Sequence, residues 1–255
     1  MKVDVFFTPA GIEETAFNDK IVVVIDVLRA STTMITALEN GAKEIIPVVE
    51  VEDALKVASS LFNERPILSG ERHGKVIQGF DLGNSPDEFA ASVVSDKSLV
   101  FCTTNGTKAI LKAKSAKILA LCAFLNVSVV KEFVLRTENL EYNLVILCAG
   151  KENRFSLEDA ICAGLLVDKL LADKRGQSIA LSDSATAARI LYEKFRGNEL
   201  AALRESEHGR YLASLGFAKD IEAAARIDVS QALPIMEDSI IRLQKVEKRK
   251  FKRVD

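Results

Sequence analysis

Five acidic residues stand where a chain of alternating strands and helices places its functional groups. Asp26 follows an apolar run, Glu71 and Asp81 lie in a glycine-rich segment, and Glu158 and Asp159 begin a helical segment. If several of these carboxylates converge, they would hold Mg²⁺, which takes oxygen ligands and retains water for substrate oxygens. A metal so placed polarises a phosphoryl oxygen and activates water at neutral pH. The acidic set therefore points to metal-assisted hydrolysis.

Polar clusters follow three apolar runs, at residues 26–33, 103–107 and 149–154, and their residue types suit an anionic ligand. Arg29 is a potential bidentate donor, and Gly106 lets the backbone approach an oxygen closely. The hydroxyls belong to Ser31, Thr32, Thr33, Thr103, Thr104 and Thr107. Each hydroxyl taken singly is explained equally well as a helix N-cap. Three clusters at three strand ends, where α/β sheets bind their ligands, favour a site for a phosphorylated or otherwise anionic molecule.

Residues 70–86 form the least generic stretch of the chain. They contain four glycines together with Glu71, Arg72, Asp81 and Asn84. A purely structural connection of this length rarely needs that combination, so an active-site loop is favoured over a plain connection. Glu158 and Asp159 follow Ser156 and have the simpler alternative of capping a helix and complementing its dipole.

Two patterns are similar to the nucleophile motifs of other phosphatases. Asp26 lies where haloacid-dehalogenase phosphatases have Asp-x-Asp-x-Thr, but Leu28 replaces the second aspartate. This departure disfavours that superfamily, while a nucleophilic Asp26 stays chemically open. Cys148 and Arg154 have the spacing of the cysteine phosphatases, but Leu147 replaces the usual histidine. Because no adjacent residue clearly lowers a thiol pKa there, we interpret Cys148 as structural.

The composition disfavours several classes of function. The chain has 34 Lys+Arg against 36 Asp+Glu, a formal net charge of −2, which argues against nucleic acid as a partner. Two histidines, and four cysteines without a Cys-x-x-Cys pair, argue against zinc. Dinucleotide and P-loop glycine motifs do not occur. Of the two histidines, His208 is interpreted as lying at a surface helix terminus, with a general acid or a substrate contact as the alternative.

The expected compartment is the cytoplasm. The N-terminal sequence lacks the features of a signal peptide, and no apolar run approaches the roughly 20 residues that cross a bilayer, so no membrane partner is expected. Cysteines 102, 122, 148 and 162 then read as buried hydrophobic residues rather than disulfides. The basic tail, residues 245–253, is interpreted as a solvated C-terminal turn.

The elements that must position these groups alternate along the chain, which predicts an α/β fold with a largely parallel or mixed sheet between two helical layers. Strands are predicted at 3–7, 21–25, 44–49, 98–101, 117–121 and 143–147, and helices at 32–40, 52–63, 107–114, 127–136 and 157–172. The rest of the chain is predicted to be helical, at 184–195, 199–206, 218–225 and 234–246. We expect a single domain, 1–255, in which residues 1–175 form the sheet and helix-rich residues 176–255 pack on it or on a second subunit of a homo-oligomer.

The sequence resembles the 2-phosphosulfolactate phosphatase family. The resemblance rests on Asp26-Val-Leu-Arg-Ala-Ser-Thr-Thr, Gly70-Glu-Arg with Gly79-Phe-Asp-Leu-Gly-Asn-Ser-Pro, Thr103-Thr-Asn-Gly-Thr, Cys148-Ala-Gly and Glu158-Asp159-Ala. It implies an α/β/α fold peculiar to the family. It also implies a Mg²⁺-dependent enzyme that converts (2R)-2-phospho-3-sulfolactate to 3-sulfolactate and phosphate, a step towards coenzyme M. A related 2-phospho-hydroxy acid is the alternative substrate.

The motifs of the resemblance mark a set of candidate site residues. They are Asp26, Arg29, Ser31, Thr32, Glu71, Arg72, Asp81, Asn84, Thr103, Thr104, Asn105, Thr107, Glu158 and Asp159. The division of roles among them is our own inference. We expect Asp26, Glu71 and Glu158 to bind the metal and Asp81 or Asp159 to position water. Arg29, Arg72 and the hydroxyl and amide groups would bind the small anionic phosphomonoester.

A non-catalytic receptor for a phosphorylated or sulfonated acid is the alternative from another class. Strand-end anion sites do not require turnover. The acidic set discriminates the two, because a pure anion receptor has no use for carboxylates beside its ligand unless a metal lies between them.

Overall fold

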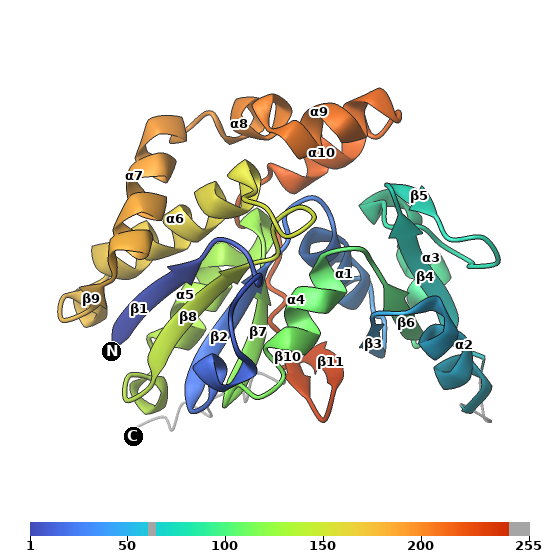
Figure 1. Cartoon of the computed structure of the whole chain (residues 1–255), viewed down its shortest axis with the longest axis horizontal. Coiled ribbons are helices and arrows are strands. Elements are labelled where there is room, and N and C mark those ends of the chain that lie inside the picture. The colour runs from blue at the N-terminus through green and yellow to red at the C-terminus, as the bar shows by residue number, and fades with distance from the viewer. Residues whose placement is uncertain (61–64, 245–255) are drawn as a thin grey trace, which may run out of the picture.

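A computed structural model describes residues 1–60 and 65–244 of the chain (Figure 1). The strands are β1 (Lys2–Phe6), β2 (Lys20–Ile25), β3 (Glu44–Val48), β4 (Ile67–Arg72), β5 (Lys75–Val76), β6 (Ser98–Cys102), β7 (Ile118–Cys122), β8 (Asn143–Cys148), β9 (Ala180–Leu181), β10 (Pro234–Glu237) and β11 (Ile240–Leu243). They form one mixed sheet in the order β5-β4-β6-β3-β11-β10-β7-β2-β8-β1-β9. The predicted α/β class, with a largely parallel sheet, is confirmed.

Two parallel groups of strands make up most of this sheet. One group contains β4, β6 and β3, and the other contains β7, β2, β8, β1 and β9. The antiparallel hairpin β10–β11 joins them, because β10 pairs with β7 and β11 pairs with β3. The sheet therefore draws its central strands from the last part of the chain.

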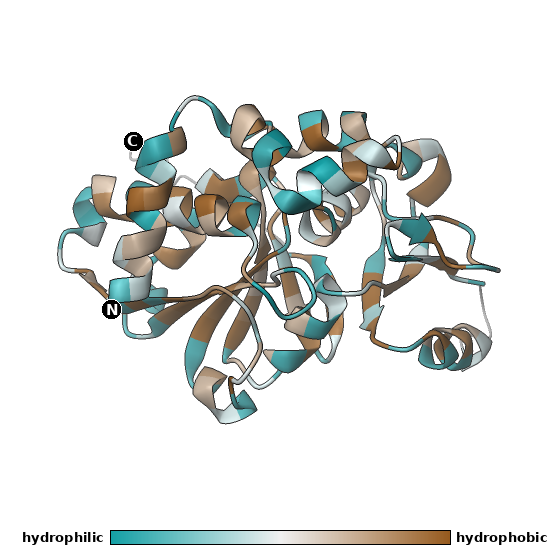
Figure 2. Ribbon diagram, turned by 45° about the horizontal axis from the view of Figure 1, so that its top comes forward, coloured by the Kyte–Doolittle hydropathy of each residue, from teal (hydrophilic) through white to brown (hydrophobic). Residues whose placement is uncertain are grey.

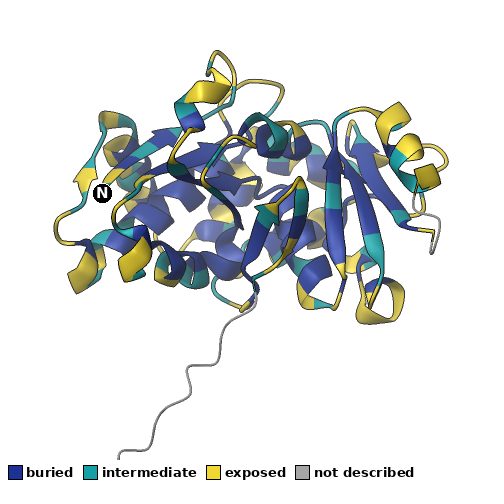
Figure 3. Ribbon diagram, turned by 90° about the horizontal axis from the view of Figure 1, so that it is seen from below, coloured by how far each residue is buried: buried dark blue, intermediate teal, exposed yellow. Residues whose placement is uncertain are grey.

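Apolar residues on both faces of the strands explain the layers. In β2, Val23 belongs to a core that includes α5 (Val127–Val134) and α6 (Leu157–Ala172). Its neighbour Val24 belongs to the opposite core, with α1 (Ala30–Glu39) and α4 (Gly106–Lys112). Successive side chains of a strand point to opposite faces, so an uninterrupted apolar run requires helices on both. Figure 2 shows the strands as largely hydrophobic, and Figure 3 shows them buried between more exposed helices.

The remaining helices include the group that reaches the candidate site. Besides those already named they are α2 (Val51–Ser60), α3 (Ala91–Val94), α7 (Asp183–Phe195), α8 (Glu199–Glu205), α9 (Glu207–Ser214) and α10 (Ala218–Ala224). Helix α7 packs on α6, and α8, α9 and α10 pack on one another. In Figure 1 these three lie above the ends of β2 and β8. The C-terminal helices thus pack within this chain, over the sheet.

The prediction of a helix at 234–246 was wrong. Residues 234–243 form β10 and β11, which are joined by Asp238 and Ser239 with φ of 49° and 64°. Two consecutive residues of positive φ make the tight turn that fits the twist of a hairpin. The Asp-Ser pair, followed directly by the β-branched residues Ile240 and Ile241, was the available signal. Residues 245–255, which contain the basic tail, lie outside the described residues.

Other elements were not predicted. No strand was predicted at β9, and β4 and β5 occupy positions where only a loop was expected. Helix α9 fills a gap between two predicted helices. In the part of the chain that the structure describes, no helix is both long and apolar enough to cross a membrane.

Candidate active site

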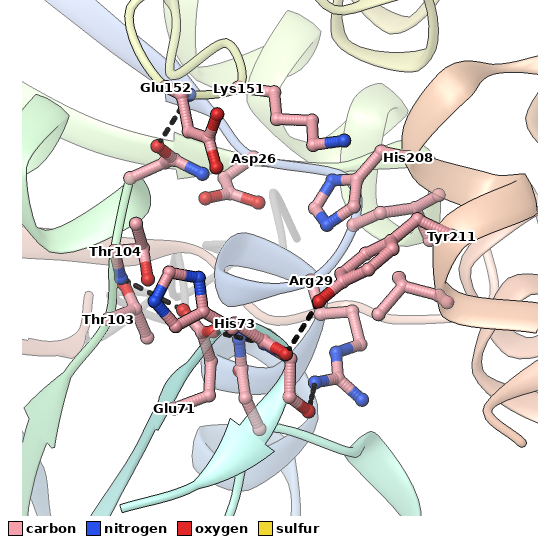
Figure 4. A pocket seen from close by; sticks show the side chains of 15 residues that line it. Asp26, Arg29, Glu71, His73, Thr103, Thr104, Lys151, Glu152, His208 and Tyr211 are labelled. Carbon is pink, nitrogen blue, oxygen red and sulfur yellow. Dashed lines mark hydrogen bonds between the residues drawn. The ribbon is translucent and has the colours of Figure 1, made fainter. Parts of the chain in front are cut away.

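A pocket of about 180 Å³ lies where β2, β4, β6 and β8 end beneath α9 (Figure 4). Pockets for drug-sized ligands occupy roughly 300–1,000 Å³, so this one suits a small molecule. It is lined by Asp26, Leu28, Arg29, Glu71, His73, Gly74, Asn84, Thr103, Thr104, Asn105, Lys151, Glu152, His208, Tyr211 and Leu212. The pocket thus combines polar groups from both parallel groups of strands with side chains of a C-terminal helix.

Asp26 lies directly after β2 and is only 6% exposed. Its Oδ1 accepts a hydrogen bond from the Ala30 backbone N–H at 3.1 Å. Burial raises the pKa of Asp26 to about 6, and the charges of Glu71 and Glu158 add to this rise, while His208 and the Ala30 N–H oppose it. A Cβ at Gly106 would lie 2.6 Å from Asp26 Oδ2, so only glycine allows this close approach. The surroundings of Asp26 therefore disfavour its ionised form.

Glu71 belongs to β4 and reaches the same pocket from the other group of strands. Its two carboxylate oxygens accept hydrogen bonds from the backbone N–H groups of Thr104, at 2.9 Å, and Gly74, at 2.8 Å. These bonds connect β4 to the turn after β6 and to the turn before β5. Strand alternation sends the next side chain, Arg72, the other way, where it binds Val49 O at 2.7 Å and lies outside the pocket lining.

Arg29 lines the pocket, but its charge is already neutralised. Its Nη1 lies 2.6 Å from Asp220 Oδ2, its Nη2 donates to Gly74 O at 3.0 Å, and the guanidinium stacks over Phe217, 4.3 Å from the ring centre. Asp220 also accepts a hydrogen bond from Ser85 Oγ at 2.7 Å. Asp220 lies in α10, far from Arg29 in the sequence. Nothing in its helical context distinguished it from an ordinary surface aspartate.

His208 and Glu158 form an acid–imidazole pair at the wall beside Asp26. His208 Nδ1 lies 3.5 Å from Glu158 Oε1, and the Glu158 side chain is 2% exposed. Burial alone would raise the pKa of Glu158, but the interaction with His208 lowers it below its ordinary value. His208 lies at the start of α9, as expected, yet it faces the pocket and not open solvent (Figure 4).

Asp159 holds two turns together behind the pocket. Its oxygens accept hydrogen bonds from the N–H groups of Val27, at 2.8 Å, and Gly150, at 3.1 Å. Burial and the charges of Asp26 and Glu158 raise its pKa well above the ordinary range. Neither Glu158 nor Asp159 belongs to the pocket lining, so the structure places them behind the wall.

Several other predicted residues lie outside the pocket. Asp81 accepts from the Leu68 N–H at 2.9 Å and pairs with Arg65 on the outer surface, so the geometry gives no support to a role in positioning water. The hydroxyls of Ser31, Thr32 and Thr107 make local backbone hydrogen bonds. Arg29, Asn84, Thr103, Thr104 and Asn105 do line it, together with Asp26 and Glu71. The structure thus brings together half of the predicted set.

Lys151, Tyr211 and His73 line the pocket but were not predicted as site residues. Lys151 belongs to a polar cluster after β8, so its position at a strand end was an available signal. Tyr211 donates a hydrogen bond to His73 O at 3.0 Å, which connects α9 to the turn before β5. Such contacts between distant segments leave no local mark in the sequence.

Two polar atoms at the pocket have no hydrogen-bond partner within the described residues. They are Asn84 Oδ1 and Thr104 Oγ1, and both are buried. Together with the Asp26 and Glu71 carboxylates they provide oxygen donors of the kind that Mg²⁺ prefers. No group of three or more His, Cys, Asp or Glu side chains is arranged to hold a metal within residues 1–60 and 65–244. The donor set therefore fits Mg²⁺ in its usual form, with one or two carboxylates and the remaining positions left to water and substrate.

Cys148 is fully buried at the end of β8, and burial raises its pKa well above the ordinary value. The four cysteines are free thiols, as predicted. A protonated, enclosed thiol is a poor nucleophile. We therefore expect Cys148→Ser to retain turnover within about threefold while lowering the melting temperature, because it buries a hydroxyl among apolar groups. Loss of phosphatase activity with an intact fold by circular dichroism would instead make Cys148 catalytic.

Comparison with known proteins identifies close relatives. A sequence model of the family described as 2-phosphosulpholactate phosphatase matches residues 6–239. A protein named "Probable 2-phosphosulfolactate phosphatase" from Clostridium novyi is 38% identical over 234 residues, which are 92% of this chain and 96% of that protein. Proteins of the same name from Caldanaerobacter subterraneus and Thermotoga petrophila are 36% and 38% identical over 242 residues, 95% of this chain and 98% of each of them. The matched region contains every residue that lines the pocket.

Proposed function

This chain belongs to the 2-phosphosulfolactate phosphatase family, and we propose that it hydrolyses (2R)-2-phospho-3-sulfolactate, or a related 2-phospho-hydroxy acid, to the hydroxy acid and inorganic phosphate. As a family member it is a phosphoric monoester hydrolase. The bond between phosphorus and the ester oxygen breaks, water supplies the new oxygen of phosphate, and the leaving alkoxide takes up a proton. The observation that carries the proposal is the convergence of Asp26 and Glu71 with Lys151 in one small pocket. If 3-sulfolactate is the product, the reaction would serve coenzyme M synthesis.

We propose Mg²⁺ as the cofactor, held by Asp26 and Glu71. Bound there, the ion would neutralise phosphoryl charge and polarise the phosphoryl oxygen. The oxygen atoms that line the pocket support this proposal. They are the two carboxylates and the Asn84 and Thr104 oxygens that have no hydrogen-bond partner. Glu158 is left out of the ligand set because it lies behind the wall and contacts His208. Asp81, which the sequence suggested for positioning water, is given no part in the reaction because it pairs with Arg65 on another surface.

The protein's own groups supply the rest of the chemistry. Thr103, Thr104 and Lys151 line the pocket, so they would bind and orient the substrate. His208 is the imidazole that can hand a proton to the leaving oxygen, with Glu158 orienting its ring from behind. Asp26 has a second possible part, as a nucleophile that forms a phospho-aspartyl bond, and the geometry is compatible with both.

Removal of divalent cations should abolish activity. We expect phosphate release from 2-phospho-3-sulfolactate to fall to background in excess EDTA and to return when Mg²⁺ is added beyond the chelator, because Asp26 and Glu71 would then repel the phosphoryl group without a cation between them. Inorganic phosphate is measured colorimetrically in each condition. Full activity in excess EDTA would remove the metal from the proposal but leave the phosphatase activity standing.

The receptor hypothesis remains as an outcome of the same assay. A receptor would be stabilised by the phosphoester without consuming it, so its melting temperature would rise while no phosphate appeared. The family membership favours turnover, since the curated relatives are named as phosphatases.

A further inference from the structure

Lys151 is the one lysine or arginine of the pocket lining whose charge is not neutralised by a buried partner, among the residues that the structure describes. Arg29 is the other lysine or arginine of that lining, and it is paired with Asp220, both side chains being 3% exposed. Arg72 lies outside the lining and bonds to Val49 O. An anionic substrate group that enters the pocket therefore meets Lys151 as its available fixed cation.

The ion pair between Lys151 and its partner, Glu207, is weak. Lys151 Nζ lies 3.0 Å from Glu207 Oε1, but the Glu207 side chain is 65% exposed and that of Lys151 only 17%. Exposed ion pairs contribute little, about 0–1 kcal/mol. Glu207 also lies 3.8 Å from Arg154 and does not line the pocket. A substrate carboxylate or sulfonate inside the pocket can therefore displace Glu207 from Lys151 at small cost.

The position of Lys151 sets it apart from the phosphoryl end of the pocket. Its ammonium lies over the Tyr211 ring, 5.1 Å from the ring centre, and Tyr211 is anchored by its bond to His73 O. In Figure 4, Lys151 lies at the upper rim, Asp26 lies below it and Glu71 lies at the lower side, so Lys151 is on the side of Asp26 away from Glu71. A molecule whose phosphate is bound by the Asp26 and Glu71 side would extend its remaining groups towards Lys151.

On the basis of the proposed function, we propose that Lys151 binds the second acid group of the substrate, a carboxylate or sulfonate near the phosphoester carbon, and thereby sets specificity for phosphoesters with such a group over simple phosphomonoesters. Glu207 is the internal carboxylate that occupies Lys151 when the substrate is absent.

The test compares O-phospholactate with isopropyl phosphate, which has the same branched carbon but no carboxylate. For Lys151→Met we expect KM for O-phospholactate to rise 10- to 100-fold, the range for losing a charge-assisted hydrogen bond. The same substitution should raise KM for isopropyl phosphate by a factor at least ten times smaller than the factor for O-phospholactate. Glu207→Gln should act in the opposite direction and lower KM for O-phospholactate, because it frees Lys151. Equal effects of Lys151→Met on both esters, or none on either, would overturn the proposal.

A matched control and a binding readout keep the outcomes separate. Lys131, 16% exposed and paired with Asp173 far from the pocket, is the control, and Lys131→Met should leave both KM values unchanged. Binding of 3-sulfolactate, followed by melting temperature, needs no turnover. If wild type released no phosphate but 3-sulfolactate stabilised it and not Lys151→Met, the proposed function would fail and the acid subsite would stand. If 3-sulfolactate stabilised both proteins equally, the subsite would fail.

Discussion

Asp26→Asn should lower phosphate release by at least 10³-fold, the largest effect expected of any substitution in this chain. The change removes a charge but keeps the shape and the acceptor that binds the Ala30 N–H. Both roles left open for Asp26 require its charged carboxylate, as a Mg²⁺ ligand or as a nucleophile. Losses of this size are usual when a group of the reacting centre is removed.

The same substitution should stabilise the metal-free protein. Burial raises the pKa of Asp26 to about 6, so above that pH the folded protein holds an ionised group that the unfolded chain tolerates better. Stability is therefore lost as the pH rises from the unfolded pKa through the folded one, and an uncharged Asn avoids the loss. We expect a gain on the order of 1–3 kcal/mol in urea unfolding at pH 8 with EDTA. Near wild-type turnover of Asp26→Asn, or a loss of stability, would contradict this account of the residue.

Asp220→Asn should cost both stability and activity, although Asp220 does not line the pocket. It leaves the buried Arg29 charge without its partner, and breaking a buried ion pair on one side costs about 3–5 kcal/mol. Because Asp220 also binds Ser85, the substitution loosens α10 from the loop before Pro86 and from the Arg29 side of the pocket. We expect kcat/KM to fall at least tenfold, since Arg29 would lose the position that packs against Gly74.

The double variant Arg29→Met with Asp220→Asn separates the two effects. Without the guanidinium no buried charge is left unpaired, so the double variant should be more stable in urea than Asp220→Asn alone, while phosphate release stays low. Asp168→Asn is the matched control, because Asp168 pairs with Arg189 and Arg196 away from the pocket and should cost under about 1 kcal/mol. A double variant less stable than Asp220→Asn would contradict this explanation, because removing the unpaired Arg29 charge would then not have restored stability.

The sequence predicted which strand-end residues meet at the site better than it predicted the direction in which each side chain points. Asp26, Thr103 and Thr104 follow predicted strands, and strand ends meet at the ligand site of such folds, so their convergence could be expected. Glu71 was expected at the site only as part of an active-site loop, because β4 was not predicted. Arg72 could be separated from Glu71 only once the pairing of β4 was known, because the pleat sends neighbouring side chains to opposite sides. Asp81 belongs to a family motif, yet it binds the β4 backbone.

What could not be predicted depends on contacts between distant segments. His208 and Asp220 come from helices α9 and α10, which fold back over the sheet, and their partners Glu158 and Arg29 lie 50 and 191 residues earlier in the chain. Helical periodicity shows that such segments have an apolar face but not which element that face meets. The hairpin β10–β11 was missed because a short apolar run fits either a helix or a strand.

The central claim is that this pocket hydrolyses a small phosphomonoester that carries at least one further acid group. The most direct measurement is the time course of inorganic phosphate released from 2-phospho-3-sulfolactate, with Mg²⁺, by wild type and Asp26→Asn purified side by side. We predict repeated turnover by wild type and a rate at least 10³-fold lower for the variant. If the substrate raises the melting temperature of wild type but no phosphate is released, the pocket is a receptor site and the claim is wrong.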